Sequence, residues 1–94
     1  MLRIEALEID DHVLEKIEAK HGVSFTEVEE ACLSDIRHIR RGREGLYKVF
    51  SQTSGGRYVL VVLANLDAGN WKVVTAREMS DSERRLHIRM IGGR

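Results

Sequence analysis

Residues 56–85 read G-R-Y-V-L-V-V-L-A-N-L-D-A-G-N-W-K-V-V-T-A-R-E-M-S-D-S-E-R-R, and this stretch decides how the chain folds. Its two apolar segments, within 57–64 and 71–76, are continuous rather than alternating. Continuous apolar runs are typical of strands that are covered on both faces of a sheet. We therefore expect the centre of a sheet here, with Arg57 and Arg77 at its rims, where a permanent cation can meet a ligand.

Further strands extend this centre towards the N-terminus. Residues 46–52 predict a strand that the turn T-S-G-G joins to 57–64 as a hairpin. Because short loops require antiparallel neighbours, the strands at 46–52, 57–64 and 71–76 should form a meander. The basic stretch I-R-H-I-R-R from residue 36 predicts another strand, ended by Gly42. Residues 2–9 alternate weakly, which leaves open a short edge strand or an ordered arm.

Two helices are predicted before the sheet. Asp10 or Asp11 can cap the start of the first helix, and Gly22 can adopt the left-handed backbone conformation that ends many helices. This helix should therefore span about 11–21. Ser24 and Glu27 form a capping box, which opens a second helix that runs to about residue 33.

A third helix is predicted after the sheet. Ser80 and Glu83 repeat the capping-box signature, and a helix of about ten residues should follow them. Its apolar residues divide into two stripes, Leu86 with Met90 and Ile88 with Ile91. Two helices, an antiparallel sheet of about four strands and a C-terminal helix make an α+β fold in a single domain, residues 1–94.

Composition narrows the class of protein. With 94 residues and 43% hydrophobic residues, the chain can bury one modest core. Residues 1–30 hold three basic against nine acidic side chains, and residues 31–94 hold twelve against six, although the formal net charge is zero. This split suits binding of a polyanion to a basic face of the protein. Alternatively, the acidic and basic segments neutralise each other within the fold. No apolar run is long enough for a membrane span, no signal peptide is visible and Cys32 is the only cysteine, so we expect a cytoplasmic protein.

Four segments appear in an order that resembles a known family. They are K-H-G-V-S-F followed by E-V-E-E-A within 20–31, G-R-Y-V-L-V-V-L at 56–63, V-V-T-A-R-E-M-S at 73–80 and E-R-R at 83–85. Together they resemble the BrnT family of toxins, which have the RelE-like ribonuclease fold. The chain departs from the family at Leu86 and His87, where a tyrosine is common.

The resemblance implies a bacterial type II toxin that cleaves RNA without a metal or any other cofactor. It also implies two partners. One is a cognate antitoxin, which can be of the ribbon-helix-helix type. The other is RNA, which can be messenger RNA on the ribosome. Positions matching Arg57 and Arg77 belong to the proposed active site of the family.

The residues themselves suggest catalytic candidates for metal-free RNA cleavage: Arg57, Arg77, Glu83 and His21. Arginine can hold a phosphate but cannot transfer its proton, whereas His21 and Glu83 can act as acid or base. Each has an equally simple structural role. The arginines can pair with carboxylates, His21 can favour the dipole at the end of the first helix, and Glu83 can serve in its capping box beside His87, one turn later.

A dense basic run supplies the RNA-binding candidates: Arg37, Arg40, Arg41 and Arg43. They can follow a phosphate backbone, or they can keep an edge strand soluble. The competing function is a non-catalytic module that uses the same fold to hold an antitoxin-like partner or RNA. A homodimer formed through the third helix is a further alternative.

Overall fold

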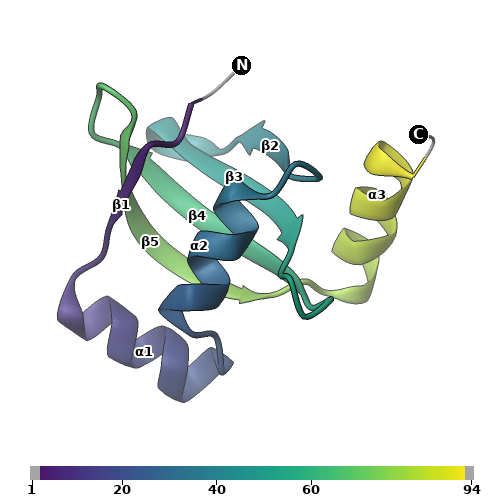
Figure 1. Ribbon diagram of the computed structural model, residues 1–94, viewed down its shortest axis with the longest axis horizontal. Coiled ribbons are helices and arrows are strands. Elements are labelled where there is room, and N and C mark those ends of the chain that lie inside the picture. The colour runs from purple at the N-terminus through teal and green to yellow at the C-terminus, as the bar shows by residue number, and fades with distance from the viewer. Residues whose placement is uncertain (1–2, 93–94) are drawn as a thin grey trace.

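The computed structural model describes residues 3–92, which form a five-stranded sheet and three α-helices (Figure 1). A 3₁₀ turn at Arg43–Gly45 precedes the third strand. Along the chain the elements are β1 (Ala6–Glu8), α1 (Asp11–His21), α2 (Phe25–Leu33), β2 (His38–Arg41), β3 (Leu46–Gln52), β4 (Tyr58–Asn65), β5 (Asn70–Glu78) and α3 (Asp81–Ile91). The predicted α+β class and the predicted helices and central strands are confirmed.

The strand order in the sheet is β1-β5-β4-β3-β2. The strands β3, β4 and β5 form the expected antiparallel meander, and β2 pairs antiparallel with β3 at its edge. The prediction of about four antiparallel strands was one strand short, because β1 joins β5 in parallel. This strand has only three residues and is fixed by distant contacts: the Trp71 indole donates to the Arg3 carbonyl at 2.9 Å. Local sequence therefore carries little signal for it.

The helices α1 and α2 lie together in front of one face of the sheet (Figure 1). In α1 the buried residue is Ile17, and Gly22 ends the helix with a left-handed φ of 63°. The apolar positions Val28, Ala31 and Cys32 of α2 face the sheet because they recur at helical spacing. They pack on Val49, Val59, Val61, Leu63 and Val73.

The other face of the sheet, called the far face below, is defined by His38, Phe50, Tyr58, Leu60 and Arg77. Direct partners across a sheet share a face, and the register pairs His38 with Phe50, Phe50 with Leu60, and Leu60 with Arg77. Tyr58 precedes Leu60 by two residues and so shares its face.

Helix α3 lies apart from α1 and α2, at one end of the sheet (Figure 1). Its fully buried residue is His87, while Leu86 and Ile91 are half-buried. The exposed fractions of Ile88 and Met90 are 43% and 57%. The predicted stripes, Leu86 with Met90 and Ile88 with Ile91, are therefore not the observed ones. Leu86 and Ile91 flank His87 on the inner side of the helix, and Ile88 and Met90 lie on the outer side. No helix within residues 3–92 combines the length and apolar composition that a membrane crossing requires.

Candidate functional site

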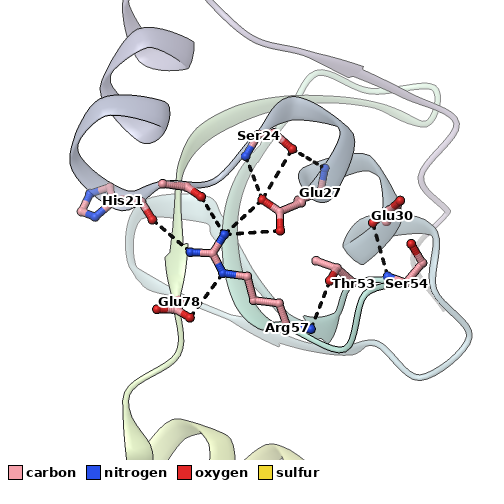
Figure 2. Close-up of polar contacts among 9 residues, drawn as sticks. His21, Ser24, Glu27, Glu30, Thr53, Ser54, Arg57 and Glu78 are labelled. Carbon is pink, nitrogen blue, oxygen red and sulfur yellow. Dashed lines mark hydrogen bonds and ion pairs between the residues drawn. The ribbon is translucent and has the colours of Figure 1, made fainter.

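Arg57 connects the α1–α2 junction to the sheet (Figure 2). Its Nη1 donates to the Gly22 carbonyl at 2.6 Å and to both carboxylate oxygens of Glu27 at 3.1 and 3.3 Å. Its Nη2 donates to the His21 carbonyl and its Nε to Glu78, each at 3.3 Å. All three guanidinium nitrogens therefore have acceptors within the chain.

Glu27 is held from two directions. Its carboxylate accepts from the Ser24 main-chain N–H at 3.0 Å, which completes the capping box of α2, and it also accepts from Arg57. The hydrogen bond from Ser24 and those from Arg57 together lower the pKa of Glu27. The Arg57 contacts thus hold the start of α2 against the rim of β4.

His21 contributes its main chain to this cluster. Figure 2 shows its carbonyl turned towards Arg57 and its imidazole turned away from the guanidinium. The side chain is half-buried in the last turn of α1. The structure therefore brings His21 next to Arg57 in space without joining the two side chains.

Arg77 and Glu83 form a second cluster at the start of α3. The Nη1 and Nη2 of Arg77 donate to the two Glu83 carboxylate oxygens at 2.7 and 2.9 Å. Glu83 also accepts from the Ser80 main-chain N–H at 2.8 Å. The hydrogen bonds from Arg77 and then Ser80 lower the pKa of Glu83 to about 2. At neutral pH this carboxyl is ionised, so it has no proton to donate.

The two arginine clusters lie on opposite faces of the sheet. Glu78, which contacts Arg57, pairs with Val59 on the face covered by α1 and α2. Arg77, one residue earlier in β5, belongs to the far face because successive side chains alternate. The four predicted catalytic residues are thus divided into Arg57 with His21, and Arg77 with Glu83.

Beside Arg77, the far face carries a group of rings that sequence reasoning did not assemble. The His87 ring of α3 lies 6.5 Å from the His38 ring and 6.0 Å from the Tyr58 ring, measured between centroids. The His38 and His87 planes are inclined by only 21°. On the other side, His38 lies 5.6 Å from Phe50, and the Arg84 guanidinium lies 5.7 Å from the centre of the Tyr58 ring.

The pKa values of the two histidines of this group are both lowered. His87 has no exposed surface, and neither of its ring nitrogens has a hydrogen-bond partner among the described residues. Burial lowers the pKa of His87, and burial together with nearby Arg40 lowers that of His38. The spacing of Glu83 and His87 was the available sequence signal. It could not indicate His38, which lies 49 positions away from His87 along the chain.

The basic side chains predicted to hold RNA point in different directions from β2 and its flanks. Arg41 lies over the Tyr47 ring, 5.6 Å from its centre, and donates to its hydroxyl at 3.1 Å. Arg40 is adjacent in the strand and therefore lies on the far face with His38. Arg37 donates to a main-chain carbonyl at the end of α2, and Arg43 is exposed in the 3₁₀ turn.

Among residues 3–92, no group of three or more His, Cys, Asp and Glu side chains is placed to hold a metal ion. Cys32 lies on the buried side of α2, and burial raises the pKa of its thiol to about 12.

A mixed sheet with two helices on one face and a third at its end defines an α+β protein of the kind that the sequence resemblance predicts. No protein-family model matches the sequence, and neither does any curated protein. Among solved structures the chain is similar to BrnT, the ribonuclease toxin of Brucella abortus, known from a 1.1 Å crystal structure. The TM-score is 0.68 over 81% of this chain and 97% of BrnT, at 15% sequence identity. The BrnT-like fold is confirmed by this likeness.

Proposed function

We propose that this chain is the toxin of a bacterial type II toxin–antitoxin pair, acting in the cytoplasm as a single-domain, metal-independent ribonuclease. The observation that carries the proposal is the likeness of nearly the whole fold to a ribonuclease toxin. The four sequence segments that resemble the BrnT family support it independently of the structure.

RNA cleavage of this kind requires a base for the 2′-hydroxyl proton, a cation for the phosphate and an acid for the departing 5′-oxygen. Arg77 suits the phosphate, because its planar fork can contact two oxygens at once. Arg57, His21 and Glu83 stay candidates for the remaining roles, with one restriction. While the pair with Arg77 holds its pKa at about 2, Glu83 is ionised and has no proton to donate.

The proposed partners are RNA and a cognate antitoxin. A ribbon-helix-helix antitoxin and a homodimer are both compatible with the exposed apolar residues Ile88 and Met90 of α3. We propose that RNA phosphates contact four arginines, Arg37, Arg40, Arg41 and Arg43. Because these side chains point in different directions, they favour a bent RNA strand over a straight one.

Induced expression in a bacterial host tests the proposed function. We expect growth arrest with loss of intact messenger RNA, and relief of both when the neighbouring open reading frame is co-expressed. The matched control is Arg77→Ala, which should be produced at the same level without arresting growth. Normal growth and intact RNA with soluble wild-type protein present would contradict the proposal.

The second candidate is a non-catalytic module that holds an antitoxin-like partner or RNA. It is favoured by one observation: the guanidinium groups of both Arg57 and Arg77 are engaged by carboxylates of the same chain. Purified protein that binds RNA but leaves it intact, under conditions where the fold is verified, would select this candidate.

A further inference from the structure

Glu83 occupies a position on the far face that is suited to a phosphate. Its two carboxylate oxygens take the two Nη donors of Arg77 at 2.7 and 2.9 Å. A guanidinium holds two oxygens of a phosphate in the same side-on manner. The Arg77 and Glu83 side chains are 41% and 24% exposed, so this position is partly accessible to solvent. A carboxylate of the same chain thus fills a place that is already arranged for an anion.

His87 occupies a neighbouring position that is suited to a flat ring. It is fully buried, and its ring lies near-parallel to that of His38, at 21°, and edge-on to that of Tyr58, at 72°. Both ring nitrogens lack hydrogen-bond partners among the described residues. The described surroundings therefore accommodate a flat ring and form no hydrogen bonds with its nitrogens. Near-parallel and edge-on ring contacts of this kind also let aromatic side chains hold the bases of single-stranded RNA.

The two residues that fill these positions lie about one helical turn apart on α3. Glu83 and His87 lie four residues apart on α3, which is about 6 Å along the helix axis. In RNA, a phosphate and its own base are separated by a single sugar, a comparable span. One nucleotide can therefore place its phosphate on Arg77 and its base against Tyr58 and His38 at the same time.

We propose that the far face beneath α3 is a nucleotide site for single-stranded RNA, and that Glu83 and His87 occupy its phosphate and base positions in the free protein. In the complex, Arg77 holds a phosphate, His38 stacks on a base, Tyr58 meets the same base edge-on, and α3 moves off the sheet. The ligand class, RNA, rests on the proposed function. The location of the site rests on the contacts of Arg77, His38 and Tyr58.

Helix α3 is suited to such an exchange because it buries little apolar surface. Ile88 and Met90 are exposed, and the buried centre of the helix is a polar ring without hydrogen bonds to the described residues. Burying such a group costs free energy, and this cost is recovered when α3 leaves the sheet and the His87 ring nitrogens are hydrated.

Binding of a short 2′-O-methylated single-stranded RNA, followed by fluorescence anisotropy, tests the proposal. This probe cannot be cleaved, because its 2′-oxygen is blocked. Glu83→Gln weakens the pair with Arg77 but keeps a side-chain oxygen for the capping box. Its matched control is Asp81→Asn, which removes the same charge from the same helix at a side chain that is 84% exposed. His87→Ala is matched by His12→Ala on the exposed side of α1.

We expect Glu83→Gln and His87→Ala each to bind the probe about fivefold to tenfold more tightly than the wild type, because the competing groups are weakened or removed. Asp81→Asn and His12→Ala should bind like the wild type. Adding Arg77→Ala or Tyr58→Ala to Glu83→Gln should abolish the gain. In the wild type, the probe should accelerate amide hydrogen exchange in α3.

Equal affinities of Glu83→Gln and Asp81→Asn would overturn the proposal, and so would unchanged exchange in α3 at saturating probe. Cleavage of unmodified RNA is scored separately. If the modified RNA binds as expected and unmodified RNA stays intact, the nucleotide site stands and the ribonuclease function fails. If RNA is cleaved while Glu83→Gln and Asp81→Asn bind alike, the function stands and the site fails.

Discussion

At the scale of single residues, Arg57 joins three segments that are distant in sequence. Its guanidinium contacts the end of α1, the start of α2 and the end of β5. The Arg57 side chain is 28% exposed, so its hydrogen bonds are only partly screened by water. The carboxylate of Glu27 and the carbonyls of His21 and Gly22 all accept hydrogen bonds from this guanidinium, and they lose this donor when the guanidinium is removed.

We expect Arg57→Met to lower the free energy of unfolding by about 2 kcal/mol, because the aliphatic stem is kept and the charged hydrogen bonds are removed. Urea denaturation at pH 7 measures this. Arg43→Met, in the exposed turn, is the control and should change stability by less than about 0.5 kcal/mol. A cost for Arg57→Met as small as that of its control would show that the cluster does not stabilise the fold.

The Arg77–Glu83 pair predicts an acid-dependent loss of stability. Folding lowers the pKa of Glu83 from 4.5 to about 2, so the pair contributes fully above pH 4.5 and is lost as the pH falls towards 2. Because the pair is partly exposed, we expect about 1 kcal/mol. Glu83→Gln should therefore narrow the difference in urea midpoint between pH 6 and pH 2.5, whereas Asp81→Asn should not. Parallel pH profiles for the wild type and Glu83→Gln would refute this assignment.

Local sequence predicts the parts of the site that depend on local chemistry. Both capping boxes follow from a serine and a glutamate three residues apart. The partition of Arg57 and Arg77 between two faces depends on strand register, and the contact of His38 with His87 depends on where α3 docks. Neither is visible in spacing along the chain, so these features could not be predicted.

At the scale of elements, the helices differ in what holds them. Helix α1 is anchored by Ile17, whose side chain is fully buried, whereas Ile88 of α3 is 43% exposed. We expect Ile17→Ala to cost about 3 kcal/mol, since it removes a buried side chain and leaves a cavity. Ile88→Ala should cost less than about 0.5 kcal/mol. Thermal unfolding compares the two, and equal costs would contradict the docking of α1.

The docking of α3 should depend on pH through His87. Burial lowers the pKa of His87 below its ordinary 6.5, so the folded state binds protons less readily than the unfolded state. The stabilisation is therefore complete above pH 6.5 and weakens as the pH falls below it. Helix α3 should exchange its amides faster at pH 5.5 than at pH 7.5, once the intrinsic pH dependence of exchange is corrected for. His87→Phe should reduce this difference, leaving the part due to His38. An unchanged difference in His87→Phe would assign the effect to other groups.

Most elements were predicted because their signals are local and repeated. The helix α1, the strand β3 and the start of α3 follow from caps, glycines and apolar runs. Local sequence allows either a strand or an arm at β1, since its three residues pair in parallel with β5 and are specified by that distant partner. The division of the apolar residues of α3 was mistaken because a histidine occupies the inner side.

At the scale of the whole molecule, charge is unevenly distributed along the chain. The acidic residues 1–30 include α1 and most of α2, and the basic residues 31–94 include β2 and α3. If RNA contacts the basic part, its affinity must fall with salt in proportion to the number of phosphates neutralised.

We expect the triple change of Arg40, Arg41 and Arg43 to alanine to reduce the salt slope of RNA binding. The reduction should be about 0.7 for each phosphate that the variant no longer neutralises. Arg37 is left intact because it donates to a main-chain carbonyl. The control replaces Lys16 and Lys20, which are exposed on α1. A slope that falls equally in the control, or not at all in the triple variant, would move the RNA surface away from β2.

Single-turnover cleavage of a defined, unmodified RNA in excess chelator tests the ribonuclease proposal most directly. The wild type should cleave with the chelator present. Arg77→Ala should be slower by about 100-fold or more, because a fixed donor to the phosphate is removed, and Arg77→Lys should recover little of the rate. His21→Ala should be affected less, since its imidazole points away from the Arg57 cluster. Full activity in folded Arg77→Ala, or intact RNA with folded wild-type protein, would contradict the ribonuclease proposal.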